Sequence, residues 1–127
     1  VIDIELVVAS ELGYAGTLDV VCKIKDRIVV LDIKTSGAIH PEHFLQVTGY
    51  ERAYFEMTGE HADRMILHLN PRTKKGYAVY GEDEMEIKGK PVSVDDFMTV
   101  YNMFLMINGG KLPEPKEVID YPLTLKL

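Results

Sequence analysis

Three charged residues interrupt apolar segments where a hydrophobic side chain would be expected. Asp19 lies between Leu18 and Val20, and Asp32 and Lys34 lie in the apolar segment 28–35. Residues 32 and 34 of a strand point to the same face, so this acid and this lysine can pair. Two carboxylates from neighbouring strands can also hold a divalent cation such as Mg²⁺, which prefers oxygen ligands.

The electrostatics of this set favour a metal site but leave an alternative open. Two facing carboxylates without a cation repel each other and raise one pKa, and a metal ion or a nearby lysine relieves that repulsion. Charged residues in strands are usually exposed to solvent. Asp19, Asp32 and Lys34 could therefore also form a solvated strand face with a cross-strand ion pair.

The hydrophobic pattern predicts the elements that carry these residues. Alternating and β-branched runs predict three strands joined by short turns, which favours an antiparallel meander, at residues 2–9, 15–24 and 28–35. Helical spacing and cap residues predict helices at 43–57 and 94–107, the second with Ser93 as N-cap. Further strands are predicted at 64–69, 76–80 and, weakly, 85–88.

This order, βββ-α-ββ-α, predicts an α/β (α+β mixed) fold with a central mixed sheet of about five strands flanked by helices. The 127 residues suit one domain, residues 1–127. Residues 111–127 contain three prolines and are predicted to form an extended C-terminal arm.

Composition excludes several classes of protein. The 14 Lys and Arg against 20 Asp and Glu give a net charge of −6, which argues against a basic protein that coats nucleic acid non-specifically. A single cysteine, Cys22, rules out a disulfide framework and an iron–sulfur cluster held by this chain alone. No apolar run is long enough to span a bilayer, so we expect a cytoplasmic protein with no membrane contact.

Three motifs together point to a known family. Gly16-x-x-Asp19 is followed by Asp32-x-Lys34 and then by Gln46-x-x-x-Tyr50 in the predicted helix. This ordered set resembles the PD-(D/E)XK nuclease superfamily, most closely its RecB-type exonuclease branch. That branch has a G-x-x-D strand, a (D/E)-x-K strand and a following helix with Q-x-x-x-Y. The resemblance covers about residues 1–57 and implies a restriction-endonuclease-like core.

The resemblance also implies a set of metal ligands. Asp19 and Asp32 would bind one or two Mg²⁺ or Mn²⁺ ions, and the backbone carbonyl of Ile33 would join them. Glu5 stands where many relatives carry an acid on the first strand.

The catalytic roles follow from the same resemblance. Lys34 would position or polarise the attacking water, Gln46 would orient the site from the helix, and Tyr50 lies one turn further on the same helix face. Relatives often carry an upstream helical segment that completes the site. This sequence opens directly in a strand, so we expect that segment to be absent from it.

The function implied is a metal-dependent nuclease that hydrolyses DNA phosphodiester bonds, as an exonuclease in recombination, repair or phage DNA processing. Its partners would be DNA, with other subunits or a helicase or recombination protein. The alternative is a catalytically inactive nuclease-fold module that binds DNA or a protein. A small α+β interaction domain with an accidental motif match is a third possibility.

Other polar features have two interpretations each. Arg72, Lys74 and Lys75 form a basic cluster on a turn, which is either simply solvated or contacts a DNA backbone. His40 and His43 are either polar residues at a helix N-terminus or contacts to DNA phosphates.

The apolar positions predict the core. We expect Cys22 to lie in the core and Gly49 to allow close packing of the first helix on the strands. Two helical stripes are expected to face the core: Val47, Tyr50, Tyr54 and Met57 in the first helix, and Phe97, Val100, Tyr101, Phe104 and Leu105 in the second.

Overall fold

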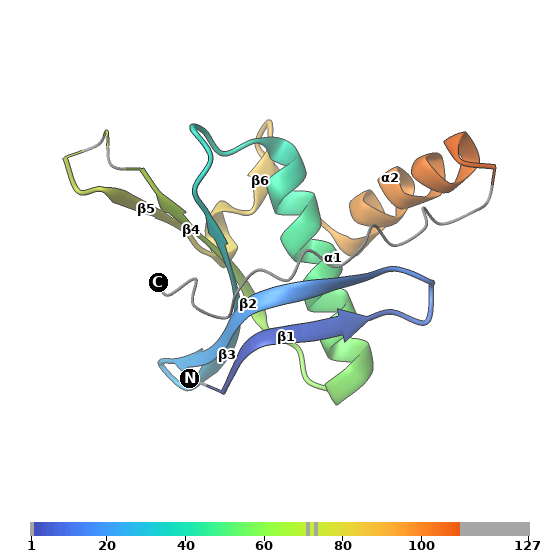
Figure 1. The fold of residues 1–127 in the computed structure, drawn as a ribbon, viewed down its shortest axis with the longest axis horizontal. Coiled ribbons are helices and arrows are strands. Elements are labelled where there is room, and N and C mark those ends of the chain that lie inside the picture. Colours follow the sequence, from blue (N-terminus) through green and yellow to red (C-terminus); the bar gives the residue numbers. More distant parts are fainter. Residues whose placement is uncertain (1, 71, 73, 110–127) are drawn as a thin grey trace.

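A mixed five-stranded sheet carries a long helix across one face in the computed structural model, which describes residues 2–70, 72 and 74–109 (Figure 1). The sheet strands are β1 (Asp3–Ala9), β2 (Ala15–Ile24), β3 (Arg27–Lys34), β4 (Asp63–Leu69) and β5 (Tyr77–Tyr80). The helices are α1 (Pro41–Thr58), the short 3-10 helix η1 (Glu82–Glu84) and α2 (Val94–Ile107). A small hairpin pairs β6 (Glu86–Ile87) with β7 (Lys90–Pro91).

The sheet order is β1-β2-β3-β4-β5. The first three strands form the predicted antiparallel meander, and β5 pairs antiparallel to β4. Between them, α1 connects β3 to β4, which run parallel. The carboxyl ends of β3 and β4 therefore meet at one edge of the sheet, and the segments that follow them emerge side by side.

The core lies between the sheet and α1. Its fully buried members from the strands are Val8, Leu18, Val21, Val30 and Ile66. Helix α1 contributes Val47, Ala53 and Tyr54 to the same cluster. One face of α1 is thus fixed against the strands that carry the charged residues.

The predicted element order is confirmed, and α2 has the predicted bounds. The Ser93 hydroxyl accepts a hydrogen bond from the Asp96 N–H, as expected for the N-cap. Helix α1 begins two residues before the predicted start, because Pro41 suits the first turn and the His40 N–H donates to His43 Nδ1 at 3.0 Å. The weak strand predicted at 85–88 is instead two residues of the β6–β7 hairpin. The predicted arm at 111–127 lies outside the described residues.

Several predicted core positions are wrong. In α2, Tyr101 is buried, but Val100 and Phe104 are 48% and 41% exposed. The helix extends beyond the edge of the sheet, and no other element of the described residues covers this part of its apolar face (Figure 1). Met57, in the last turn of α1, is 52% exposed, and Cys22 is only half-buried. No helix among the described residues is both long and apolar enough to cross a membrane.

Candidate active site

The acid and the lysine of the Asp32-x-Lys34 motif lie at the carboxyl end of β3. Asp32 is 4% exposed, and Lys34 Nζ lies 2.9 Å from its Oδ2. Strand alternation puts both side chains on the face covered by α1. The predicted pairing of these two residues is confirmed.

Helix α1 supports the lysine. Lys34 Nζ donates to Gln46 Oε1 at 2.6 Å, and Gln46 Nε2 donates to Tyr50 Oη at 2.8 Å. Gln46 and Tyr50 are one turn apart, so one helix face presents both to the strand. The lysine is therefore held between a carboxylate on its own strand and an amide on the helix.

Asp19 reaches the same end of β3 from β2. Its Oδ2 accepts a hydrogen bond from the backbone N–H of Ile33 at 2.6 Å. Leu18 and Val21 are both fully buried although they are three residues apart, so the two-residue alternation of β2 is interrupted between them. Asp19 lies at this interruption, and its carboxylate is directed at the backbone of β3 between the two motif residues.

A close contact explains why the first motif contains a glycine. A Cβ atom on Gly16 would overlap the ring of Tyr50. The glycine of one motif thus makes room for the tyrosine of another, and the strand and the helix can approach closely only with this pair. Gly49 has a different role from the one predicted: its Cβ would overlap Phe97, so it admits α2, not the site strands.

The electrostatics leave Asp32 in an unfavourable position. Burial, together with the neighbouring Asp19 carboxylate, raises the pKa of Asp32 from 3.8 to about 6, against the lowering effect of Lys34. Its Oδ2 is buried and, despite the nearby Lys34, has no partner with hydrogen-bond geometry among the described residues. Burial, followed by the charge of Asp32, also raises the pKa of Tyr50.

These groups suit a hard divalent cation in part. Asp19 and Asp32 provide two carboxylates, one with an unsatisfied buried oxygen, and the neighbouring Ile33 can offer a backbone carbonyl. Mg²⁺ commonly takes one or two carboxylates and completes its shell with water and substrate phosphate. The described residues contain no group of three or more His, Cys, Asp or Glu side chains that could hold a metal ion.

Glu5 lies beside this set but is not gathered into it. The pairs Ile4 with Val20 and Leu6 with Leu18 put Glu5 opposite Asp19 in the ladder. Its side chain is exposed, and its φ of 53° lies in the left-handed region, which is uncommon for a residue other than glycine.

The sequence analysis missed His68. This residue is 7% exposed, lies opposite Lys34 in the β3–β4 register, and its Nε2 is 2.6 Å from the carbonyl oxygen of Ser36. This contact links β4 to the loop that follows Lys34. A lone polar residue inside the apolar run 65–69 was the available signal. Nearby, burial and the charge of Lys34 lower the pKa of His43.

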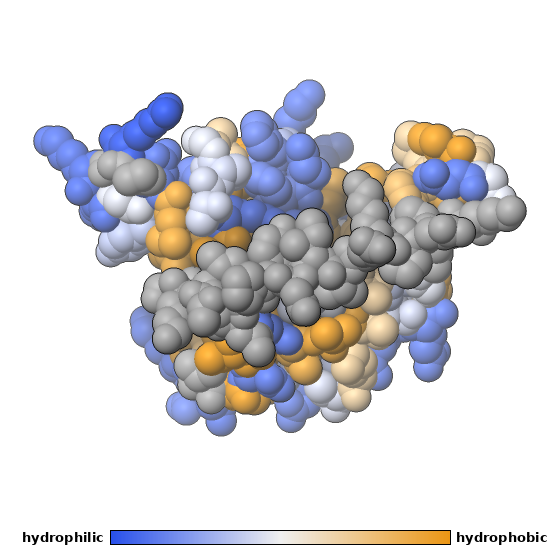
Figure 2. Space-filling model, viewed as in Figure 1, coloured by the Kyte–Doolittle hydropathy of each residue, from blue (hydrophilic) through white to orange (hydrophobic). Residues whose placement is uncertain are grey.

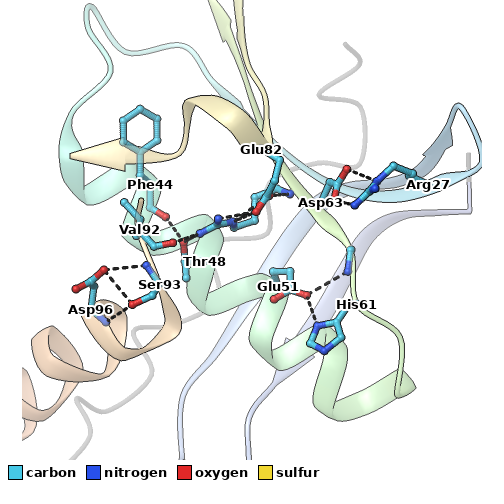
Figure 3. Close-up of polar contacts among 12 residues, drawn as sticks. Arg27, Phe44, Thr48, Glu51, His61, Asp63, Glu82, Val92, Ser93 and Asp96 are labelled. Carbon is cyan, nitrogen blue, oxygen red and sulfur yellow. Dashed lines mark hydrogen bonds and ion pairs between the residues drawn. The ribbon is translucent and has the colours of Figure 1, made fainter. Parts of the chain in front are cut away.

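A second polar network lies on the other side of α1. Arg64 Nη1 donates to Thr48 Oγ1 at 2.8 Å and to the Val92 carbonyl at 2.6 Å. Its Nη2 donates to Glu82 Oε1 at 2.6 Å (Figure 3). This network joins β4 and α1 to the segment between β5 and α2.

No protein-family model matches the chain, and no curated protein is significantly similar to it.

Proposed function

We propose that the chain is a metal-dependent nuclease that hydrolyses DNA phosphodiester bonds, built on the restriction-endonuclease-like core of the PD-(D/E)XK superfamily. The observation that carries this proposal is the convergence of Asp19, Asp32, Lys34, Gln46 and Tyr50. These residues come from two strands and a helix, and they meet at one end of β3 in a linked set of polar contacts.

The site residues divide the work as phosphodiester cleavage requires. A divalent cation bound by the two aspartates would supply charge stabilisation and a water of lowered pKa. Lys34 adds a positive charge where negative charge develops on the phosphate. Gln46 holds the lysine in place, and Tyr50 fixes the amide of Gln46 from the next turn.

The mixed sheet supports the same proposal, because the parallel pair β3 and β4 leaves the motif residues at an accessible edge. Within this proposal the enzyme is an exonuclease of recombination, repair or phage DNA processing. Further subunits, or a helicase or recombination partner, would enlarge its DNA-binding surface.

A second candidate is an inactive nuclease-fold module that binds DNA or a protein. The observation in its favour is the exposed Glu5, which leaves only two carboxylates converging among the described residues.

The deciding experiment offers linear and closed circular DNA to the purified chain with Mg²⁺ or Mn²⁺, and compares wild type with Lys34→Ala. Loss of this charge lowers the cleavage rate by about 10²–10³-fold. Lys23→Ala, an exposed lysine on β2, is the matched control and keeps wild-type activity.

Cleavage of linear DNA alone identifies an exonuclease. If the wild type cleaves neither DNA with either metal, the enzyme proposal fails; DNA binding without cleavage then favours the inactive module.

A further inference from the structure

The β4–β5 hairpin is the cationic part of an acidic chain. No Asp or Glu occurs between Asp63 and Glu82, whereas this stretch carries Arg64, Arg72, Lys74 and Lys75. The rest of the chain holds the other 10 basic residues and all 20 acidic ones, a balance of 10 − 20 = −10 against +4 here. Figure 2 shows hydrophilic side chains gathered at this end of the molecule.

The hairpin turn lies at the same sheet edge as the candidate active site. Lys34 pairs in register with His68, and the turn begins two residues later at Asn70. With strands about 4.8 Å apart and a rise of about 3.3 Å per residue, Arg72 lies at most about 15 Å from Lys34 along the edge. In Figure 1 the β4–β5 hairpin extends to the upper left and the loop after β3 lies at the top, whereas the β2–β3 turn lies at the lower left.

Two hydrogen bonds join described residues of this turn, and its three cationic side chains are exposed to solvent. The Asn70 side chain accepts from the Arg72 N–H at 3.0 Å, and the Asn70 N–H donates to the Gly76 carbonyl at 2.9 Å. The side chains of Arg72, Lys74 and Lys75 are exposed, and no ion pair among the described residues involves them. Arg64, in contrast, is neutralised by Glu82.

We propose that this turn binds the sugar–phosphate backbone of DNA within a few nucleotides of the phosphate held at Asp19, Asp32 and Lys34. The inference rests on the proposed function and adds the path of the DNA strand, which leaves the site across β4 towards β5. Contacts from lysine and arginine to phosphate are independent of base sequence, as a nuclease of broad specificity requires. The exposed apolar face of α2 has no charge to offer a phosphate.

The test compares two double variants with equal charge change. Lys74→Gln/Lys75→Gln removes two charges from the hairpin, and Lys23→Gln/Lys25→Asn removes two from the opposite edge. Each shifts the net charge to −6 − 2 = −8. Asn is chosen at position 25 because Lys25 has a φ of 50°, which Asn tolerates. Thermal unfolding checks that both variants fold.

Binding of fluorescently labelled DNA is measured by anisotropy in EDTA, between about 50 and 200 mM salt. We expect the hairpin variant to bind at least tenfold more weakly at the lowest salt. The magnitude of the slope of log K against log salt should fall by about 1.4–1.8, since each of the two lost phosphate contacts removes about 0.7–0.9. The control variant keeps the wild-type slope.

Equal losses in the two variants, wild-type binding by the hairpin variant, or no DNA binding by the wild type would each overturn the inference. Because the assay needs no cleavage, its result is independent of the enzyme proposal. A chain that binds DNA through the hairpin without cutting it retains this inference and loses the nuclease function. A nuclease whose hairpin variant binds normally retains the function and loses the inference.

Discussion

Two polar networks flank helix α1, and they differ in how well their groups are satisfied. Around Arg64, each guanidinium nitrogen has an acceptor: Glu82 for Nε and Nη2, and Thr48 and Val92 for Nη1. At the end of β3, Asp32 keeps a buried oxygen without a hydrogen bond and has a raised pKa.

The difference indicates different roles. A satisfied buried network adds to stability and holds elements together. A buried carboxylate that remains under-satisfied costs free energy in the fold, and such groups concentrate where a ligand completes them. We therefore propose that the Arg64 network stabilises the fold and that the Asp32 set serves the proposed function.

The largest effect on stability is expected from the first network. Arg64→Met keeps the stem of the side chain but leaves the acceptors of three segments unpaired, and should lower the free energy of unfolding by about 2–4 kcal/mol. Urea denaturation measures this loss. Cleavage per folded molecule should change little; a large loss of activity at normal stability would contradict the division between the networks.

Substituting the two close-packing glycines should have smaller effects, which differ between cleavage rate and stability. Gly16→Ala forces the Tyr50 ring away from its position under the strand and so disturbs Gln46 and Lys34, with an expected fall in cleavage rate of about tenfold. Gly49→Ala displaces Phe97 instead, and should cost about 1–3 kcal/mol of stability with little change in rate per folded molecule. Steady-state kinetics beside thermal unfolding distinguishes them, and equal rate losses would contradict the assigned roles.

The sequence predicted the structure correctly where the signals are local. Alternation in 2–9, the β-branched and apolar runs at 15–24 and 28–35, and the short turns between them predicted the meander. The Ser93 cap with the apolar run that follows it predicted the bounds of α2. The juxtaposition of Lys34, Gln46 and Tyr50 followed from the motif order. Each of these depends on residues close together in the chain or on a recognised pattern.

Non-local features could not be predicted in the same way. The partners of Arg64 come from α1, η1 and the residue after β7, so no single stretch of sequence indicates the network. Periodicity identified the apolar face of α2 but not whether another element would cover it. The role of Gly16 depends on how closely α1 approaches β2, which only the packed structure defines.

We propose that an ionised Asp32 lowers the stability of the fold and is retained because its carboxylate binds a divalent cation. The folded chain raises the pKa of Asp32 to about 6, so the stability linked to this group is full below pH 4 and is lost as the pH rises through 6. At pH 7.5 without metal, Asp32→Asn should therefore be more stable than wild type, by about 1–3 kcal/mol.

The most direct test measures the unfolding free energy of wild type and Asp32→Asn at pH 7.5, with and without Mn²⁺. At a Mn²⁺ concentration about 1,000 times its dissociation constant, the wild type should gain about 4.1 kcal/mol, and Asp32→Asn should gain little. The account predicts this reversal of the order of stability. If Mn²⁺ stabilises neither protein, or both equally, Asp32 is not part of a metal site and this proposal is wrong.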